Sequence, residues 1–190
     1  HPVAHSFPTR RSSDLEVIVG DATAMYFAAP NQYILGEGYS VLLRVMDRVI
    51  GTLYAGRRVP EWLRKKYARE SEALAAVLHD RGIRVRRPRP IVPTANEPPG
   101  LVQVFARDPI VAIGEVVLEA RQRIPALRKE IRGLRPLLEE LEDAGNRIVG
   151  PPPDDGTYLD GGDVLVDLPY CFVGVGKHAS NMRGVEWLRS

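Results

Sequence analysis

One order of elements occurs twice along this sequence: an amphipathic helix, a glycine, a short strand, a proline-rich loop, and an acid beside an apolar strand. The glycines that end the two helical patterns, Gly82 and Gly145, are 63 residues apart, and the acids Asp108 and Asp163 are 55 residues apart. A period of about 60 residues is typical of supersecondary units that stack around an axis. We therefore expect an α/β fold of strand–strand–helix–strand units, each with an acid just after an apolar strand.

Hydrophobic spacing predicts where the elements of these units lie. Apolar residues recur at helical spacing from Pro60 onward, and Ile83 and Val85 alternate with arginines as in a half-buried strand. The stretch 39–54 fits either a helix or a strand. We expect helices over residues 60–82, 125–145 and from Asn181 onward, and strands over residues 16–20, 83–88, 101–120 (two strands joined near Gly114), 146–150, 158–166 and 171–176.

The composition excludes several classes of protein. The 190 residues suffice for one domain with a core, and the net charge of +2 points to no strongly charged partner. No apolar run reaches the roughly 18 residues of a membrane helix, and a single cysteine fits a reducing cytoplasm. The arginines of residues 81–89 lack interleaved aromatics, so we expect them to pair with acids of a neighbouring unit rather than bind nucleic acid.

The first 15 residues do not look like part of the folded domain. The segment SFPTRRSSDL has no apolar period, and its reverse translation is similar to a common short-read sequencing adaptor. We therefore treat residues 1–15 as a non-native or disordered segment and exclude them from the fold. Residues 16–190 form the predicted domain. Because the last residues, NMRGVEWLRS, read as an unfinished helix, we expect the chain to be a fragment.

Three acids are the strongest candidates for a functional site. Asp108 stands in FARDP, and Asp160 and Asp163 bracket a Gly-Gly pair in LDGGD, where the backbone allows close approach. Such a set could bind a hard cation such as Ca²⁺ or Mg²⁺. It could instead bind a planar guanidinium through paired charge-assisted hydrogen bonds. A third interpretation is structural, with each aspartate capping a turn.

The motifs around these acids resemble the guanidino-group-modifying superfamily, the penteins. The similarity is carried by FARDP, followed by YLDGGDVLV and FVGVGKHASNMRGVEWL, and it runs from Glu16 to Ser190. EVIVG, IRVRRPRP and VLEARQRIPALRKEIRGLR look most like the amidinotransferase branch, whereas LDGGD looks more like arginine deiminases and dimethylarginine dimethylaminohydrolases. The resemblance implies a five-bladed α/β propeller, of which this chain would hold about two and a half blades.

The resemblance also implies a chemistry and its residues. A cysteine thiolate attacks the guanidinium carbon, acids hold the nitrogens, and a histidine moves protons. Asp160 matches the catalytic acid, and Asp108 and Asp163 match substrate-binding acids. The family's cysteine and histidine would follow Ser190, so we expect Cys171 to be a buried core thiol. Lesser site candidates are Arg107, His178 and Asn181.

The sequence thus predicts an amidinotransferase that moves the amidino group of arginine, or of a related guanidino compound, to an amine. The alternatives are a guanidino hydrolase of the same superfamily and a non-catalytic repeat domain that binds a ligand or a metal ion. We expect a small guanidino partner, no resident metal or other cofactor, and no nucleic-acid or membrane partner. A homo-oligomer and a cytoplasmic location are compatible with the composition.

Overall fold

The computed structural model describes residues 15–30 and 40–190. The adaptor-like segment therefore lies outside the described residues except for its last member, Leu15. The regular elements, in chain order, are β1 (Glu16–Ile18), β2 (Met25–Tyr26), α1 (Val41–Tyr54), α2 (Glu61–His79), β3 (Arg84–Arg86), β4 (Leu101–Val102), β5 (Ile110–Ile113), β6 (Val116–Glu119), η2 (Arg128–Glu130), α3 (Ile131–Asp143), β7 (Arg147–Val149), η3 (Gly161–Asp163), β8 (Val164–Asp167), β9 (Tyr170–Val173) and α4 (Met182–Arg189).

The centre of the fold is one complete strand–strand–helix–strand unit, as the repeat predicts. Strands β5 and β6 form an antiparallel hairpin, and β7 returns parallel to β6 after α3. The helix packs on this sheet because its apolar residues recur on one side. The cluster they form with the sheet is Ile110, Val117, Leu134, Leu137 and Leu138.

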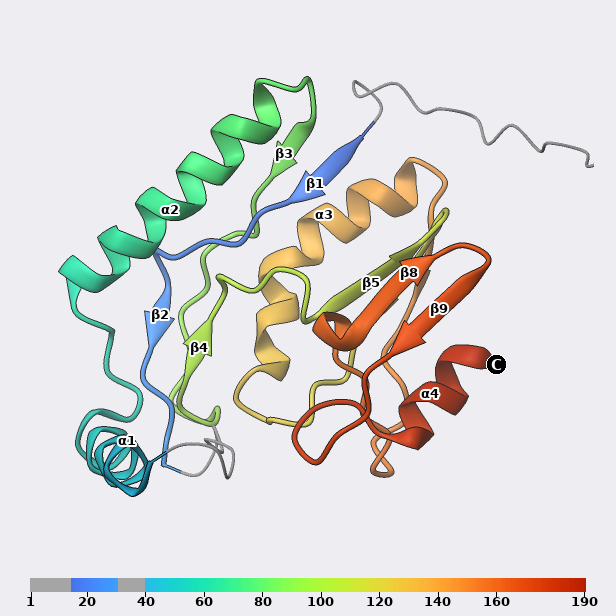
Figure 1. Cartoon of the computed structure of the whole chain (residues 1–190). Coiled ribbons are helices and arrows are strands. Elements are labelled where there is room, and N and C mark those ends of the chain that lie inside the picture. Colours follow the sequence, from blue (N-terminus) through green and yellow to red (C-terminus); the bar gives the residue numbers. More distant parts are fainter. Residues whose placement is uncertain (1–14, 31–39) are drawn as a thin grey trace, which may run out of the picture.

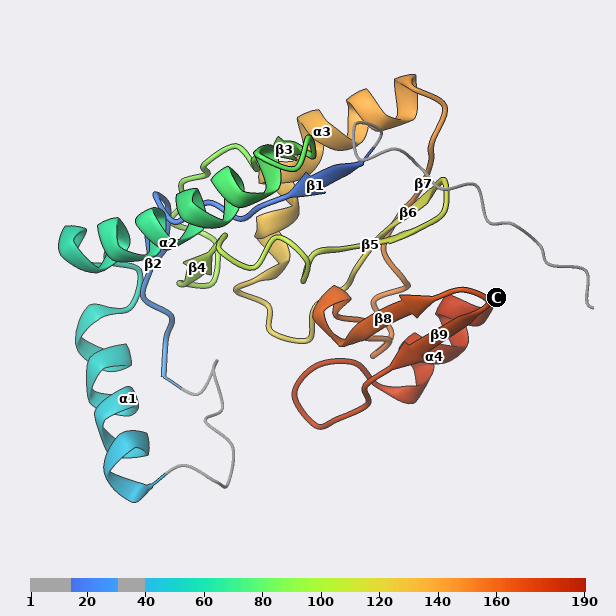
Figure 2. The ribbon, with the colours of Figure 1, turned by 45° about the horizontal axis from the view of Figure 1, so that its top comes forward.

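Parts of the same unit flank the centre on both sides. Before it, β1 and β3 pair in parallel and are joined through α2, and β1 lies between α2 and α3 (Figure 1). After it, β8 and β9 form an antiparallel hairpin followed by α4. The 45° turn of Figure 2 shows β8, β9 and α4 gathered on one side of the central sheet. The described strands form four separate small sheets and no closed barrel, so the five-bladed propeller stays a prediction.

The two N-terminal helices are much less buried than the central one. Residues 41–54, which fit helix or strand by sequence, form α1, and the Ser40 side chain accepts a hydrogen bond from Leu43 N at its start. The predicted helix after Pro60 is confirmed as α2, with Pro60 at the N-cap rather than in the first turn. Although the apolar residues of α2 recur at helical spacing, none of its residues is fully buried, and Trp62 is 69% exposed. The described chain has no helix long and apolar enough to cross a bilayer.

The arginine-rich strand β3 behaves as predicted. Arg86 forms ion pairs with Glu16 on the neighbouring strand and with Glu140 on α3 of the central unit. The side chain of Arg87 instead binds Glu72 on α2. Arg86 therefore connects the first unit to the central one, whereas Arg87 forms its ion pair within its own unit. That this basic run binds no nucleic acid stays a prediction.

The predicted strand over residues 158–166 is wrong in its first half. Asp160 caps a single turn of 3₁₀ helix, η3, and the strand begins only at Val164. Likewise, residues 103–109 form turns between β4 and β5 rather than a continuous strand. Both acidic motifs therefore precede a hairpin strand instead of following one. The Gly-Gly pair and the Asp-Pro step break the extended pattern, because both favour turns.

The prediction that Cys171 is a buried core thiol is also wrong, since the structure places it at the surface. Cys171 lies on β9 and pairs with Val166 on β8. Within the described chain β9 has a partner strand on one side only. Val173, two residues further on, packs against the cluster around Leu159 and Val164. The strand itself was predicted correctly, but of its residues only Val173 is partly buried, and Cys171 lies outside the core of the described chain.

Candidate active site

Two loops that are far apart in the sequence meet at the acids. The carbonyl oxygen of Asp108 accepts a hydrogen bond of 2.8 Å from Gly161 N. Gly161 is required at this contact, because a Cβ there would lie only 2.1 Å from the carbonyl oxygen of Arg107 and 2.3 Å from that of Ile110. The backbones of the FARDP and LDGGD motifs are therefore in direct contact.

This contact brings the carboxylates of both Asp108 and Asp160 close to Gly162. A Cβ on Gly162 would lie 2.7 Å from Asp108 Oδ1 and 3.2 Å from Asp160 Oδ1. Gly162 is exposed, and its missing side chain leaves the space between the two carboxylates open. The structure thus brings together, next to the exposed Gly162, the two acids that the sequence ranked first.

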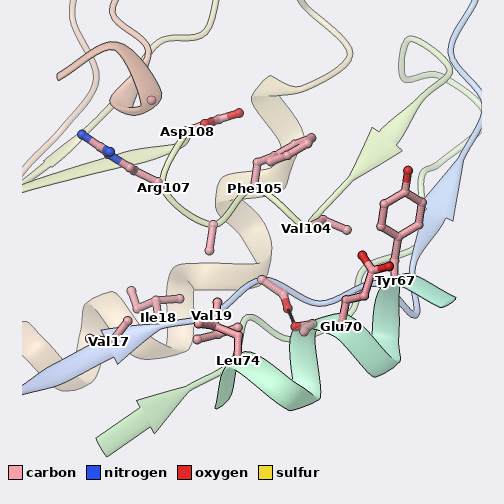
Figure 3. Close-up of a pocket in the computed structure, with 14 residues that line it drawn as sticks. Val17, Ile18, Val19, Tyr67, Glu70, Leu74, Val104, Phe105, Arg107 and Asp108 are labelled. Carbon is pink, nitrogen blue, oxygen red and sulfur yellow. Dashed lines mark hydrogen bonds between the residues drawn. The ribbon is translucent and has the colours of Figure 1, made fainter. Parts of the chain in front are cut away.

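The gap adjoins a cavity with a volume of about 510 Å³. Asp108 and Gly162 line one side of the cavity, and Tyr67 and Glu70 of α2 line another. Figure 3 shows Phe105 between Asp108 and the α2 side chains, with the strand β1 along the floor. An apolar wall next to paired carboxylates suits a small cation that carries an aliphatic chain.

Asp160 is held firmly by its surroundings. Its Oδ1 accepts a hydrogen bond of 2.9 Å from Gly162 N, and its own backbone N–H donates to Ser180 Oγ at 2.9 Å. Burial raises the pKa of Asp160, and the nearby charge of Asp163 raises it further, whereas the Gly162 N–H and the amide of Gln122 act in the opposite direction. Asp160 is therefore a preoriented acid.

Asp108 has an even more perturbed titration. Burial, followed by the charges of Asp160 and Asp163, raises the pKa of Asp108 from 3.8 to about 7, and Arg107 opposes this only weakly. In Figure 3 the Arg107 side chain points away from Asp108, and its guanidinium donates to the carbonyl oxygen of Val164. Asp108 can therefore change its charge near neutral pH.

A third carboxyl group, Glu130, belongs to this cluster and was not predicted. It is 3% exposed, and its Oε1 accepts a hydrogen bond of 2.8 Å from Val102 N. Burial raises its pKa to about 8, with the charge of Asp108 as a further contribution. A sequence signal did exist, because Glu130 stands at helical spacing from the buried Leu134 and Leu137 and so lies on the apolar side of the helix pattern.

Asp163 and Asn181 serve mainly to connect segments. Asp163 Oδ2 accepts a hydrogen bond of 2.9 Å from Ser180 N, which fixes the segment before α4. Asn181 caps α4 by accepting from Gly184 N at 3.0 Å, and its Nδ2 donates to the Gly156 carbonyl oxygen at 2.7 Å. Both residues therefore shape the loop that carries Asp160, and their predicted roles in the site stay predictions.

The remaining candidate, His178, lies exposed in the bend between β9 and α4. Within the described chain, neither Asp108, Asp160 nor Glu130 forms an ion pair with a lysine or an arginine. No three His, Cys, Asp or Glu side chains of that same part are arranged so that they could hold a metal ion. What the arrangement offers is a pair of carboxyl groups next to a cavity, with no ion-pair partner among the described residues.

Similar arrangements of the chain occur in solved structures of known enzymes. SxtG, an amidinotransferase of the saxitoxin biosynthetic pathway from Microseira wollei, aligns with a TM-score of 0.75 and 20% identity over 92% of this chain and 57% of SxtG. Inosamine-phosphate amidinotransferase StrB1 from Streptomyces griseus aligns with a TM-score of 0.72 and 21% identity over 92% of this chain and 56% of StrB1. The chain has the pentein fold. The resemblance seen in the sequence is confirmed at this level.

A second branch of the pentein fold is less similar. A dimethylarginine dimethylaminohydrolase from Pseudomonas aeruginosa, solved as a Cys-to-Ser mutant with citrulline, aligns with a TM-score of 0.52 and 14% identity over 92% of this chain and 55% of the hydrolase. No protein-family model matches the chain. The chain spans little more than half the length of the two amidinotransferases.

Proposed function

We propose that the chain forms the guanidinium-binding part of an amidinotransferase that takes the amidino group from arginine, or from a related guanidino compound, and transfers it to an amine. The observation that carries this proposal is the approach of Asp108 Oδ1 and Asp160 Oδ1 to the exposed Gly162, where a side chain is missing. Two carboxylates without a protein cation match the charge and the geometry of a planar guanidinium.

In this proposal the chain's residues bind and orient the cation. Asp108 and Asp160 each accept hydrogen bonds from guanidinium N–H groups, and the cavity beside Phe105 takes the aliphatic chain. Cys171 lies exposed on β9, and we assign the nucleophile to a cysteine outside this chain, together with the histidine. Asp160 is the acid closest to the reacting carbon in this assignment, and Asp108 secures the far nitrogen.

The reaction has two balanced steps. A thiolate forms a bond to the guanidinium carbon, the bond from that carbon to Nε of arginine breaks, and this nitrogen takes a proton, so that it leaves as the δ-amino group of ornithine. An acceptor amine then forms a carbon–nitrogen bond, the carbon–sulfur bond breaks, and the acceptor loses a proton. The electron pair of the carbon–sulfur bond returns to the thiolate, and no oxidant or reductant is needed.

The second candidate is a guanidino hydrolase, in which water replaces the acceptor amine. The citrulline-bound dimethylaminohydrolase supports it, because that protein has the same fold and acts on a guanidino compound. Its TM-score of 0.52 is lower than the 0.75 of SxtG, which favours the transferase. With an active form of the protein, ornithine that appears only when an amine acceptor is added indicates transfer, whereas citrulline formed from arginine and water indicates hydrolysis.

Binding of the cation can be measured on the chain itself. We expect calorimetry at pH 8 to detect arginine binding, and Asp160→Asn and Asp108→Asn each to weaken it by about tenfold or more, since each removes a charge-assisted pair. Asp167→Asn, at an exposed acid on β8, is the matched control and should bind as the wild type does. Equal affinities for all four proteins would contradict the proposed role of the paired acids.

A further inference from the structure

A buried glutamine next to the acid pair has an amide that no protein group satisfies. Gln122 is 2% exposed, and within the described chain its Nε2 has no hydrogen-bond partner. Leaving a buried amide unsatisfied costs about 1–3 kcal/mol, and such groups are rare in native structures. The position of this amide therefore calls for a functional or structural reason.

The backbone places Gln122 beside Asp160. Leu159 N donates to the carbonyl oxygen of Arg121 at 3.1 Å, so the residues that precede Gln122 and Asp160 are hydrogen-bonded to each other. On the other side, Arg128 Nε donates to the carbonyl oxygen of Gln122 at 2.9 Å. The glutamine is thus fixed at its backbone, and only its side chain can adjust.

Asp160 has room for one more donor. One carboxylate oxygen, Oδ1, already accepts from Gly162 N. The amide of Gln122 lowers the pKa of Asp160, although its Nε2 has no formed hydrogen bond within the described chain. A hydrogen bond from Nε2 to the Asp160 carboxylate would satisfy the amide. A donor there would also stabilise the charged form of Asp160.

We propose that Gln122 is a positioning residue for Asp160: its Nε2–H group donates to the Asp160 carboxylate and holds it, ionised, facing the space above Gly162. A guanidinium ligand then binds the same carboxylate from the side of the gap. The identity of that ligand rests on the proposed function, but the pairing of Gln122 with Asp160 does not, because it can be observed without a ligand.

Gln103 is a matched control, because it is also a buried glutamine, 3% exposed, but is fully engaged elsewhere. Its Oε1 accepts from Ile91 N at 2.9 Å, and its Nε2 donates to the carbonyl oxygen of Arg89 at 3.1 Å. Both of its contacts are structural and neither involves an acid. Replacing either glutamine by methionine preserves much of the volume and removes the amide.

The experiment is a pH titration of the Asp160 carboxyl carbon by ¹³C NMR in the wild type, Gln122→Met and Gln103→Met. We expect the pKa of Asp160 to rise by about one unit in Gln122→Met, which corresponds to about 1.4 kcal/mol. We expect no change in Gln103→Met, which should instead have the lower melting temperature. An unchanged titration of Asp160 in Gln122→Met would overturn the proposal.

Two additions keep the outcome decisive. If Gln122→Met does not fold, Gln122→Leu also removes the amide donor and should likewise raise the pKa of Asp160; an unchanged pKa there overturns the proposal as well. Arginine affinity should be lower in Gln122→Met than in the wild type, by up to about tenfold, and the difference should shrink as the pH rises and Asp160 ionises. If wild-type protein binds no arginine while the titration shift appears, the proposed function fails and the role of Gln122 stands.

Discussion

The loop that carries Asp108 and the loop that carries Asp160 face the same gap but are built differently. Asp160 has a backbone donor at its carboxylate and a second tie through Ser180 Oγ. The described chain forms no hydrogen bond to the Asp108 carboxylate, and Phe105 in the same loop is 59% exposed. One acid is therefore held in place by hydrogen bonds, whereas the other is surrounded mainly by apolar groups and by other acids.

This difference assigns different work to the two acids. A carboxylate with fixed donors keeps its orientation, which suits a group that must meet a reacting atom. A carboxyl group whose pKa is raised to about 7, as in Asp108, binds a cation well only when the pH is high enough to ionise it. We therefore expect Asp160 to orient the ligand through its fixed carboxylate, and Asp108 to contribute a negative charge only when the pH is high enough to ionise it.

The largest effect should come from separating the two loops. In Gly161→Ala the new methyl group would lie 2.1 Å from the carbonyl oxygen of Arg107, and backbone on both sides prevents relief. We expect the free energy of unfolding to fall by about 3 kcal/mol in urea denaturation. Gly150→Ala, with no atom within 4 Å of the added Cβ, is the control and should change stability little. Equal losses for the two variants would show that the loop contact is not tight.

The next effect tests the acid cluster below Asp108. The pKa of Glu130 is raised to about 8, so between pH 4.5 and 8 the unfolded chain releases a proton that the folded chain keeps, and stability falls as the pH rises. Glu130→Gln removes this loss and can still accept from Val102 N. We expect the variant to gain on the order of 2 kcal/mol over the wild type between pH 5 and 8. Parallel stability curves would contradict the raised pKa.

The pH dependence of binding separates the two acids directly. Below pH 7 the affinity of the wild type for arginine should fall by up to about tenfold per pH unit, because Asp108 takes up a proton while the guanidinium stays charged. In Asp108→Asn the affinity should be weaker at pH 8 but should lose the step near pH 7. Calorimetry from pH 5.5 to 8.5 measures both, and a step that survives in Asp108→Asn would assign it to another group.

The smallest effect concerns the support of the Asp160 loop. Ser180 is fully buried, and its Oγ accepts from Asp160 N. Ser180→Ala should lower stability by about 1 kcal/mol, the usual net value of such a bond, and should leave the titration of Asp108 unchanged. Ser190→Ala, at an exposed serine, is the control with no expected effect. A shifted Asp108 pKa in Ser180→Ala would show that the two loops are not independent.

Much of the fold could be predicted from periodicity alone. The helical pattern after Pro60 and the pattern before Gly145 became α2 and α3, and Asn181 caps α4 as its position at the start of a helix pattern suggested. The errors concentrate where turns interrupt apolar stretches. Residues 158–163 look like the start of a strand, but the Gly-Gly pair forms η3, because contact with the Arg107 carbonyl oxygen favours a turn there.

The candidate site was predicted only in part. Asp108 and Asp160 stand in motifs with distinctive neighbours, so they could be found by sequence. Glu130 and Gln122 have no such neighbours, and they matter because folding buries them beside the acids. The exposure of Cys171 was likewise unpredictable, since a strand pattern indicates which face a residue is on but not how far along the strand the core extends.

The amino-acid sequence by itself determined the repeated strand–strand–helix–strand pattern and the two acidic motifs, because hydrophobic period and turn residues act over a few neighbours. Only the tertiary structure decided that the motifs meet backbone to backbone at Gly161, and that Gly162 leaves a gap between Asp108 and Asp160. It also decided the charge of the cluster. A carboxyl group's pKa depends on burial and on charges from distant parts of the chain, and those arise only when the chain has folded.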